Sequence, residues 1–450
     1  MTLDRVLMQW VVIWFVAAAY VLFRQWKTDK GVGLLLTYVL TFGMLHWAAP
    51  VLYLLPWYDS SWHDLTREGS RLAAYAMVAF AVGTEIERWL PGHAHSQVHG
   101  SALERKAAST RAVKIYLMTG VILYVVITPM ANAIPSVSAI VATGSMLVVI
   151  ALGLKCWNAW RKRRSRLFWG CLMATSLLPV VTVVMQGFLG YGFAAMLTVF
   201  AFVASFYRPR WKVMVLGLAF AYLGLSVFVT YMRDREEIRG VVWGGSGFDQ
   251  RFSRIADTVG SAEWFNIYDA GQLDRIDGRL NQNYLIGASV KHLEGKFVEF
   301  ANGATLLDAV LAIVPRALWP DKPMTAGSGQ LVAKFTGATF AAGTSVGIGQ
   351  LMELYVNFGA WGVTIGFLVI GVVVMRIDGK AARALHRGDV RSFVLWYLPG
   401  LSLLQIGGSF VDVTSTAAAG VVMAAALRHL MGHLKRRRES SSATVVPTAS

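Results

Sequence analysis

The side chains best suited to bind a charged ligand are cations in the interval from Arg233 to Ser345. Twelve lysines and arginines lie there, together with about as many acids. Arginine matches phosphate oxygens with two parallel N–H groups and stays charged, so a group of arginines could bind a diphosphate. The alternative is that most of these cations pair with the acids beside them. The cations considered are Arg233, Arg235, Arg239, Arg251, Arg254, Arg275, Arg279, Arg316, Lys322 and Lys334.

The segment 313–323, IVPRALWPDKP, holds two of these cations in a rigid setting. Its prolines fix φ and so restrain Arg316 and Lys322, which apolar residues flank. These two cations are therefore favoured as phosphate ligands. Trp319 lies between them and could either stack on a sugar ring or anchor the chain at the membrane interface.

A second feature is Glu353, in the stretch 349–359, GQLMELYVNFG, beside a long apolar run. A charge deep in a membrane costs about 2.5–3.5 kcal/mol, so such a residue usually faces a bundle interior or a wet cavity. Glu353 could act as a general base or orient a hydroxyl, with Tyr355 and Asn357 nearby to bind sugar. The alternative is an ion pair with an arginine of the polar interval.

Motifs for a metal or a nucleotide are missing from the sequence. It contains no P-loop, no HExxH and no Cys/His cluster with metal-ligand spacing. The nearest carboxylate pair is Asp274 and Asp277, and salt bridges to Arg275 and Arg279 explain it better than a metal does. We therefore expect neither a metal nor a cofactor.

The composition is that of a membrane protein. Hydrophobic residues make up 55% of the 450-residue chain and charged residues only 15%, which is unlike a soluble globular protein. The net charge of +16 lies in short clusters beside apolar runs and not on one face of a soluble domain. This distribution argues against a nucleic-acid partner.

Apolar runs predict an all-α polytopic membrane protein with about eleven transmembrane helices. Basic residues gather in every second short connection, which places those connections and the C-terminus in the cytoplasm and the N-terminus outside. The interval 233–345 then lies outside as well. The runs are 6–23, 31–55, 71–88, 113–131, 137–156, 167–186, 192–207, 213–232, 350–375, 392–408 and 412–430.

This layout divides the chain into four parts. Residues 1–232 form a bundle of about eight spans, 233–345 a large outer loop, 346–431 about three further spans, and 432–450 a disordered cytoplasmic tail. Within the loop, Arg251 to Gly260 and Asn283 to Phe300 show the periodicity of amphipathic helices.

The segments 303–323 and 353–359 resemble those of the Wzy-type O-antigen and oligosaccharide repeat-unit polymerases. The resemblance is specific over about 275–375 and elsewhere concerns the layout, many spans with one large outer loop before the last helices. Arg233/Gly244 and Arg316/Gly327 fit the family's spacing of an outer arginine and a glycine eleven residues later. A second outer loop of comparable length is missing, and His292 is the one histidine of the long loop.

The resemblance implies an activity, a place and partners. Such polymerases transfer an undecaprenyl-diphosphate-linked glycan onto another lipid-linked repeat unit at the periplasmic face of the bacterial inner membrane. The product is O-antigen or exopolysaccharide, and no metal or cofactor takes part. The implied partners are the lipid-linked glycan and membrane lipids. Whether a chain-length regulator protein also binds stays open.

Residue roles follow from joining the resemblance to the side chains above. Arg316, Arg279 and Glu353 are the expected catalytic residues, and Trp319, Tyr355 and Asn357 the sugar-binding ones. The expected diphosphate-binding residues are Lys322, Arg275, Arg254, Arg251 and Arg233. Two alternatives remain: a ligase that moves the glycan to a different acceptor, and a transporter or flippase without chemistry.

Overall fold

The computed structural model describes residues 4–28, 31–90, 107–127, 135–207, 211–314, 318–319, 321–322, 326–340 and 346–443. Within these ranges, side chains at 135–141, 211–214, 216 and 433–443 lie outside the description. The described residues form helices and connecting segments and contain no strand, so the predicted all-α class is confirmed.

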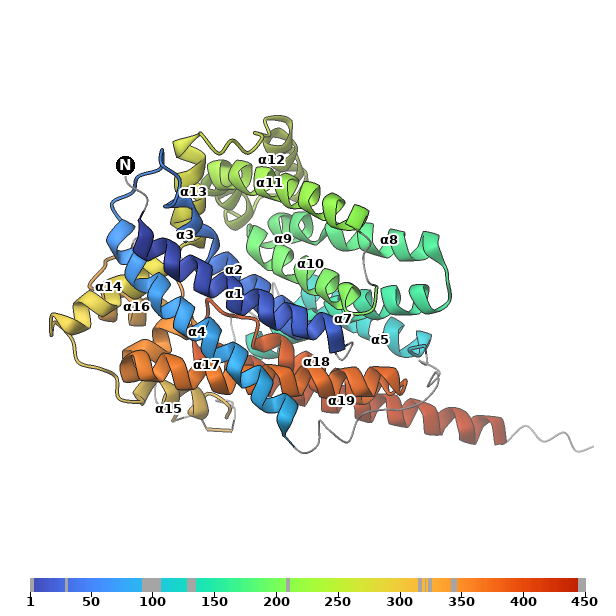
Figure 1. Ribbon diagram of the computed structural model, residues 1–450. Helices are drawn as coiled ribbons and strands as arrows, with labels where there is room; N and C mark the ends of the chain where they lie inside the picture. Colours follow the sequence, from blue (N-terminus) through green and yellow to red (C-terminus); the bar gives the residue numbers. More distant parts are fainter. Residues whose placement is uncertain are drawn as a thin grey trace, which may run out of the picture.

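The first half of the chain is a series of helices joined by short connections (Figure 1). Two apolar runs are each broken into consecutive helices, α2 with α3 and α8 with α9. The elements are α1 (Arg5–Thr28), α2 (Leu34–His46), α3 (Ala48–Leu52), α4 (His63–Trp89), α5 (Thr110–Ile122), the π-helical η2 (Leu123–Ile127), α7 (Pro135–Arg161), α8 (Ser165–Ser176), α9 (Leu178–Gln186), α10 (Leu189–Ala204) and α11 (Trp211–Trp243).

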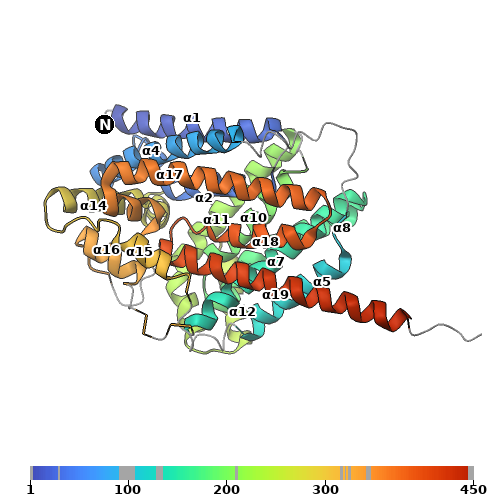
Figure 2. The same cartoon turned by 90° about the horizontal axis from the view of Figure 1, so that it is seen from below.

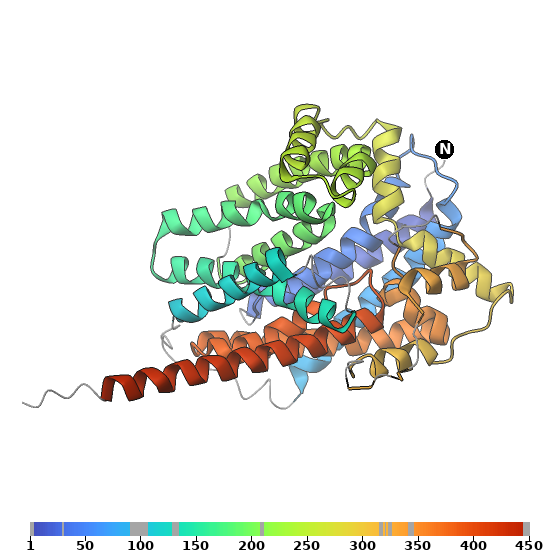
Figure 3. The ribbon, with the colours of Figure 1, turned by 180° about the vertical axis from the view of Figure 1, so that it is seen from behind.

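The second half begins with five short helices and ends with three apolar ones. The short helices are α12 (Phe248–Gly260), α13 (Ala270–Leu280), α14 (Asn283–Glu294), α15 (Ala304–Leu311) and α16 (Ser328–Thr336). The last three are α17 (Gly349–His386), α18 (Val390–Ser402) and α19 (Phe410–Ala443). Four of the short helices, α13 to α16, gather at the end of the molecule where the N-terminus lies, while α12 packs on α11 nearer the middle (Figures 1 and 3). The end of α19 projects from the opposite end.

Six helical stretches in the described part of the chain are long and apolar enough to cross a membrane, which indicates a membrane protein. This number is smaller than the predicted eleven. Helices α2 and α10 are apolar but too short, and the other predicted runs form no described helix that is both long and apolar enough. The six are Arg5–Thr28, Thr110–Ile127, Ala142–Arg161, Ser165–Gln186, Gly349–His386 and Phe410–Gly432.

Helix ends differ from the prediction in two places. The helix predicted from Asn283 to Phe300 ends at Glu294, and Lys296 then takes a left-handed φ of 57° that reverses the chain. The tail predicted to be disordered from 432 continues as part of α19 to Ala443, and residues 444–450 lie outside the described part.

The segment 233–345 is not an independent domain, because α14 is tied to the apolar bundle by polar contacts. The Asn283 amide donates to the backbone oxygen of His46 at 3.0 Å, and its Oδ1 lies 2.8 Å from His46 Nδ1. The backbone N–H of Gln282 donates to Leu45 O at 3.1 Å. The end of α2 therefore fixes where α14 begins.

Helices α1, α4 and α17 run side by side in that order along one face of the molecule (Figures 1 and 2). Glycines allow α4 and α17 to approach closely: a Cβ at Gly371 would overlap the Phe80 carbonyl oxygen, and one at Gly83 would overlap that of Leu368. Near its start α17 is kinked at Phe358 and Gly359, where Gly359 has φ 62° and ψ −151°. Only glycine takes that conformation easily.

We expect Gly371→Ala to destabilise the protein by roughly 1–3 kcal/mol, because the new methyl group forces α4 and α17 apart. Thermal unfolding in detergent measures the effect. Gly170→Ala is the control, since a Cβ at Gly170 meets nothing within 4 Å. An unchanged melting temperature for Gly371→Ala would contradict the close approach of the two helices.

Candidate functional site

The C-terminal end of α9 is the first feature of the candidate site. The last carbonyl groups of a helix lack partners inside it, so other groups must satisfy them. Tyr231 Oη donates to Gly187 O at 2.8 Å, and Trp243 Nε1 donates to Gln186 O at 3.1 Å. Arg239 Nε also donates to Gly187 O at 3.4 Å. Aromatic and cationic side chains of α11 thus cap α9 and hold the two helices together.

Arg251, on α12, likewise donates hydrogen bonds to backbone carbonyl groups of neighbouring segments. Its guanidinium donates to the carbonyl oxygens of Ser246, Val184 and Val242 at 2.9, 3.4 and 3.2 Å, and it lies 5.6 Å from the Phe248 ring centroid. Cations near a helix C-terminus are stabilised by the helix dipole. Arg251, expected to bind diphosphate, is therefore engaged in joining α9, α11 and α12.

Arg235, Arg239 and Arg279 form a cationic group, which we call the arginine cluster. Arg235 and Arg239 are four residues apart on α11 and so share a face, and α13 brings Arg279 against them. Burial lowers the pKa of Arg239, and the charges of Arg235 and Arg279 lower it further. Burial likewise lowers the pKa of Arg279, followed by the charge of Arg235.

The surroundings of the arginine cluster are aromatic. The Arg239 guanidinium lies 4.4 Å from the ring centroid of Phe188 and 5.1 Å from that of Trp243. Tyr231 is buried and Tyr191 is 63% exposed, and both act electrostatically on Arg279. Among the described residues, Arg235 makes no hydrogen bond or ion pair. Like charges on one helix face destabilise each other, so this arrangement suits an anionic ligand.

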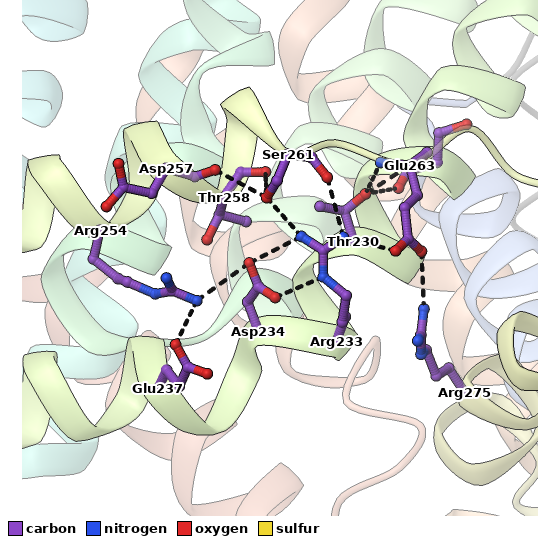
Figure 4. A network of polar contacts seen from close by, with 11 residues as sticks. Thr230, Arg233, Asp234, Glu237, Arg254, Asp257, Thr258, Ser261, Glu263 and Arg275 are labelled. Carbon is purple, nitrogen blue, oxygen red and sulfur yellow. Dashed lines mark hydrogen bonds and ion pairs between the residues drawn. The ribbon is translucent and has the colours of Figure 1, made fainter.

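A second set of arginines, by contrast, is neutralised by acids of the same segment (Figure 4). Arg233 bonds Asp234 and Glu263, each at 2.7 Å. Arg254 bonds Glu237 at 2.7 Å and Asp234 at 3.3 Å, and Arg275 bonds Glu263 at 3.2 Å. Three of the four arginines expected to bind diphosphate are thus paired with acids, in what we call the acid–arginine network.

Hydrogen bonds to Arg233 lower the pKa of Asp234 and of Glu263 below their ordinary values. Carboxyl groups with lowered pKa stabilise the fold above their ordinary pKa of about 4, and this contribution is lost as pH falls through the lowered values. We therefore expect α12 to lose several-fold of its hydrogen-exchange protection between about pH 6 and about pH 3. Protection of α14, which lies outside the network, is the internal control. Unchanged α12 protection would contradict this role of the network.

The acids Asp274 and Asp277 anchor α13, in a different way from the predicted salt bridges with Arg275 and Arg279. Asp277 is buried and accepts hydrogen bonds from Tyr53 Oη at 2.6 Å and from the Asn281 amide at 2.8 Å. Asp274 accepts from Tyr58 Oη at 3.1 Å. Burial raises the pKa of Asp277. The connection between α3 and α4 thereby positions α13 and its Arg279.

Glu353 is fully buried near the start of α17 and caps another helix. Its Oε2 accepts a hydrogen bond from the Phe410 N–H, at the start of α19, at 2.7 Å. Oε1 is buried without a hydrogen bond in the described part of the chain, and the nearby charges are Asp308 and Asp412. The alternative of an ion pair is not seen with any described arginine, and the carboxylate lies instead at a helix N-terminus, which attracts it.

Asn357, one turn later, attaches α15 to α17. Its amide donates to Thr305 Oγ1 and to Glu353 O, both at 2.7 Å, and its Oδ1 accepts from the Gly303 N–H at 2.9 Å. Both donors are used inside the protein, which favours a structural role for Asn357. Tyr355 is 6% exposed and contacts Phe300 at a centroid distance of 6.3 Å. Binding of sugar by Asn357 and Tyr355 stays a prediction.

The remaining predicted residues follow α15. Lys322 Nζ donates to Val314 O at 3.1 Å, and Trp319 is 38% exposed. Arg316 lies outside the described residues. Helices α13 and α15 lie on opposite flanks of this end of the molecule (Figures 1 and 3). The structure does not show the single clamp expected from the sequence.

Two residues of the arginine cluster, Arg235 and Arg239, were among the cations considered but not among the predicted site residues. Their spacing of four residues beside Tyr231 and Trp243 was the available signal. It did not single them out, because other charged residues on the same helix show the same spacing. Arg233 and Glu237 are also four residues apart, and the structure pairs each of them with a different partner, Asp234 and Arg254.

Comparison with known proteins gives one match. The curated proteins and the solved structures contain no match to this chain. A family model described as "Domain of unknown function (DUF8712)" matches residues 94–390. This range includes the arginine cluster, the acid–arginine network and Glu353. It covers well over half of the chain, and the protein therefore belongs to the DUF8712 family.

Proposed function

We propose that this protein is a membrane glycosyltransferase that joins undecaprenyl-diphosphate-linked repeat units into O-antigen or exopolysaccharide. The proposal assigns it to the periplasmic face of the bacterial inner membrane. The proposal includes about eleven transmembrane spans, with the N-terminus in the periplasm and the C-terminus in the cytoplasm. In this orientation α12 to α16 lie outside, together with the arginine cluster.

The observation that supports the proposal most is the arginine cluster. Arg235, Arg239 and Arg279 gather beside aromatic side chains, and Arg235 has no hydrogen bond or ion pair to a described residue. A diphosphate carries the opposite charge and offers several oxygens to arginine N–H groups. Tyr191 and Trp243 are residue types common at the level of lipid headgroups, where a lipid-linked diphosphate would lie.

The proposed reaction depends on leaving-group stabilisation. An acceptor hydroxyl oxygen forms a bond to the anomeric carbon, and the carbon–oxygen bond to the diphosphate breaks with its electron pair on the phosphate oxygen. The hydroxyl proton passes to solvent. Fixed cations stabilise the charge that grows on the leaving diphosphate. Arg235 and Arg279 are the assigned ligands, and Arg239 holds the cluster against α9.

Glu353 has a supporting role in this proposal, because it is buried and hydrogen-bonded to the start of α19. A general base must come within hydrogen-bond reach of the proton that it removes. The buried carboxylate instead sets the positions of α17 and α19 under α15.

Deleting the coding sequence in cells that make the polymer tests the proposal. We expect the ladder of chain lengths to disappear while single repeat units continue to be attached. A ligase would behave differently, since its loss leaves long chains on the lipid carrier. Loss of all surface glycan, including single units, would contradict the proposal and favour transport.

A further inference from the structure

A pocket of about 360 Å³ lies where α7 meets α8, and we call it the α7–α8 pocket. It is at the end of the molecule opposite the N-terminus, far from the arginine cluster (Figures 1 and 3). The lining includes two cations and four aromatic residues. They are Arg163, Arg164, Trp160, Phe168, Trp169 and Tyr207.

The cations of this pocket have no anionic partner in the described structure. Arg163 and Arg164 belong to a run of basic residues, 161–166, and both side chains are exposed. No acidic residue stands between Glu104 and Asp234 in the sequence. The acids in the later turns of α4 have other partners, since Glu85 bonds Arg24 and Arg88. The positive charge is therefore available to a ligand.

The aromatic residues give the α7–α8 pocket a rigid wall. Phe168 and Tyr207 lie 5.4 Å apart between ring centroids, and Trp169 contacts Tyr207 at 6.5 Å. Trp160 is held by Phe206 at 5.1 Å. Tryptophan and tyrosine are enriched at membrane–water interfaces, so these side chains suit a pocket at the depth of lipid headgroups.

An apolar stripe leads away from the pocket along α8. Trp169 lines the pocket and is 47% exposed, and Met173, one turn further, is 64% exposed. Leu177, another turn on, is 59% exposed. Residues four apart share a helix face, so the stripe is continuous from the cations to the middle of a span. An acyl chain can lie along it while its headgroup stays at the cations.

We propose that the α7–α8 pocket binds the headgroup phosphate of an acidic phospholipid, with an acyl chain along Trp169, Met173 and Leu177. Arg163 and Arg164 bind the phosphate oxygens through charge-assisted hydrogen bonds. The volume of about 360 Å³ accommodates a headgroup but not whole acyl chains, which remain in the bilayer. This site is independent of the proposed glycosyl transfer, because it lies at the other end of the molecule.

Native mass spectrometry of the full-length protein in detergent tests the proposal. The probes are dioleoylphosphatidylglycerol, dioleoylphosphatidylcholine and inorganic phosphate. The test variant is Arg163→Asn with Arg164→Gln, in which asparagine tolerates the left-handed φ of 51° at position 163. The control variant, Arg161→Gln with Arg166→Gln, removes equal charge from the same turn outside the pocket lining.

We expect phosphatidylglycerol to bind the unaltered protein tightly, and the test variant to bind it on the order of tenfold more weakly. The control variant should retain most of the affinity. Equal losses in the two variants would overturn the proposal, because they would indicate attraction to a basic surface without a site. Equal binding of phosphatidylcholine would also overturn it. Inorganic phosphate binding as tightly as the lipid would overturn the lipid assignment.

Discussion

Replacing Arg235 with glutamine is expected to abolish polymer growth while the protein remains folded and abundant. Its side chain is half-buried and has no hydrogen bond or ion pair to a described residue, so its replacement breaks no polar contact of the described fold. Removing one fixed group that stabilises developing charge costs roughly 10²–10³ in rate. Chain-length ladders and immunoblots from complemented deletion cells measure the two effects.

Arg275→Gln is the matched control for Arg235→Gln. It removes the same charge from the neighbouring acid–arginine network, and Glu263 keeps its 2.7 Å bond to Arg233. We expect this variant to make a normal ladder. Normal chain lengths in Arg235→Gln cells, at normal protein level, would remove the arginine cluster from the mechanism. A loss of equal size in both variants would show that charge alone, and not the cluster, matters.

The second large effect is expected from Glu353→Ala, and it concerns stability. The substitution leaves the Phe410 N–H buried without an acceptor, which costs roughly 1–3 kcal/mol. The vacated volume adds a further penalty. Thermal unfolding in detergent should show a clearly lowered melting temperature, and polymer should decrease with the amount of folded protein.

Glu353→Gln separates the structural role of this residue from a catalytic one. The glutamine carbonyl can still accept from Phe410, while its NH₂ group faces Asp308 and Asp412 and carries no buried charge. We expect stability equal to or above that of the unaltered protein, with polymer still formed. A folded, stable Glu353→Gln protein without polymer would instead identify Glu353 as the general base predicted from the sequence.

Local patterns in the sequence were sufficient to predict helices, but they did not predict which residues the polar side chains contact. The amphipathic pattern from Arg251 to Gly260 predicted α12, because periodicity within one helix depends only on neighbouring residues. The contact between Glu353 and Phe410 joins positions 57 residues apart, and no local pattern contains it. Its existence depends on how α17 packs near the start of α19.

The arginines illustrate the same limit at the candidate site. The sequence shows as many acids as cations in the interval 233–345, but not which cations the acids neutralise. Asp234, Glu237 and Glu263 pair with three arginines, because α12 and α13 fold back onto α11. Arg235 lies on α11 and Arg279 on α13. Only the packing of α13 shows that they lie together.

The most direct test of the proposed function uses purified protein in lipid vesicles with a defined undecaprenyl-diphosphate-linked repeat unit. We expect chains longer than the supplied unit, with one undecaprenyl diphosphate released for each new glycosidic bond. The Arg235→Gln protein should release almost none. Lipid-linked units that remain unextended in the presence of folded, unaltered protein, or that only cross the bilayer, would contradict the proposal.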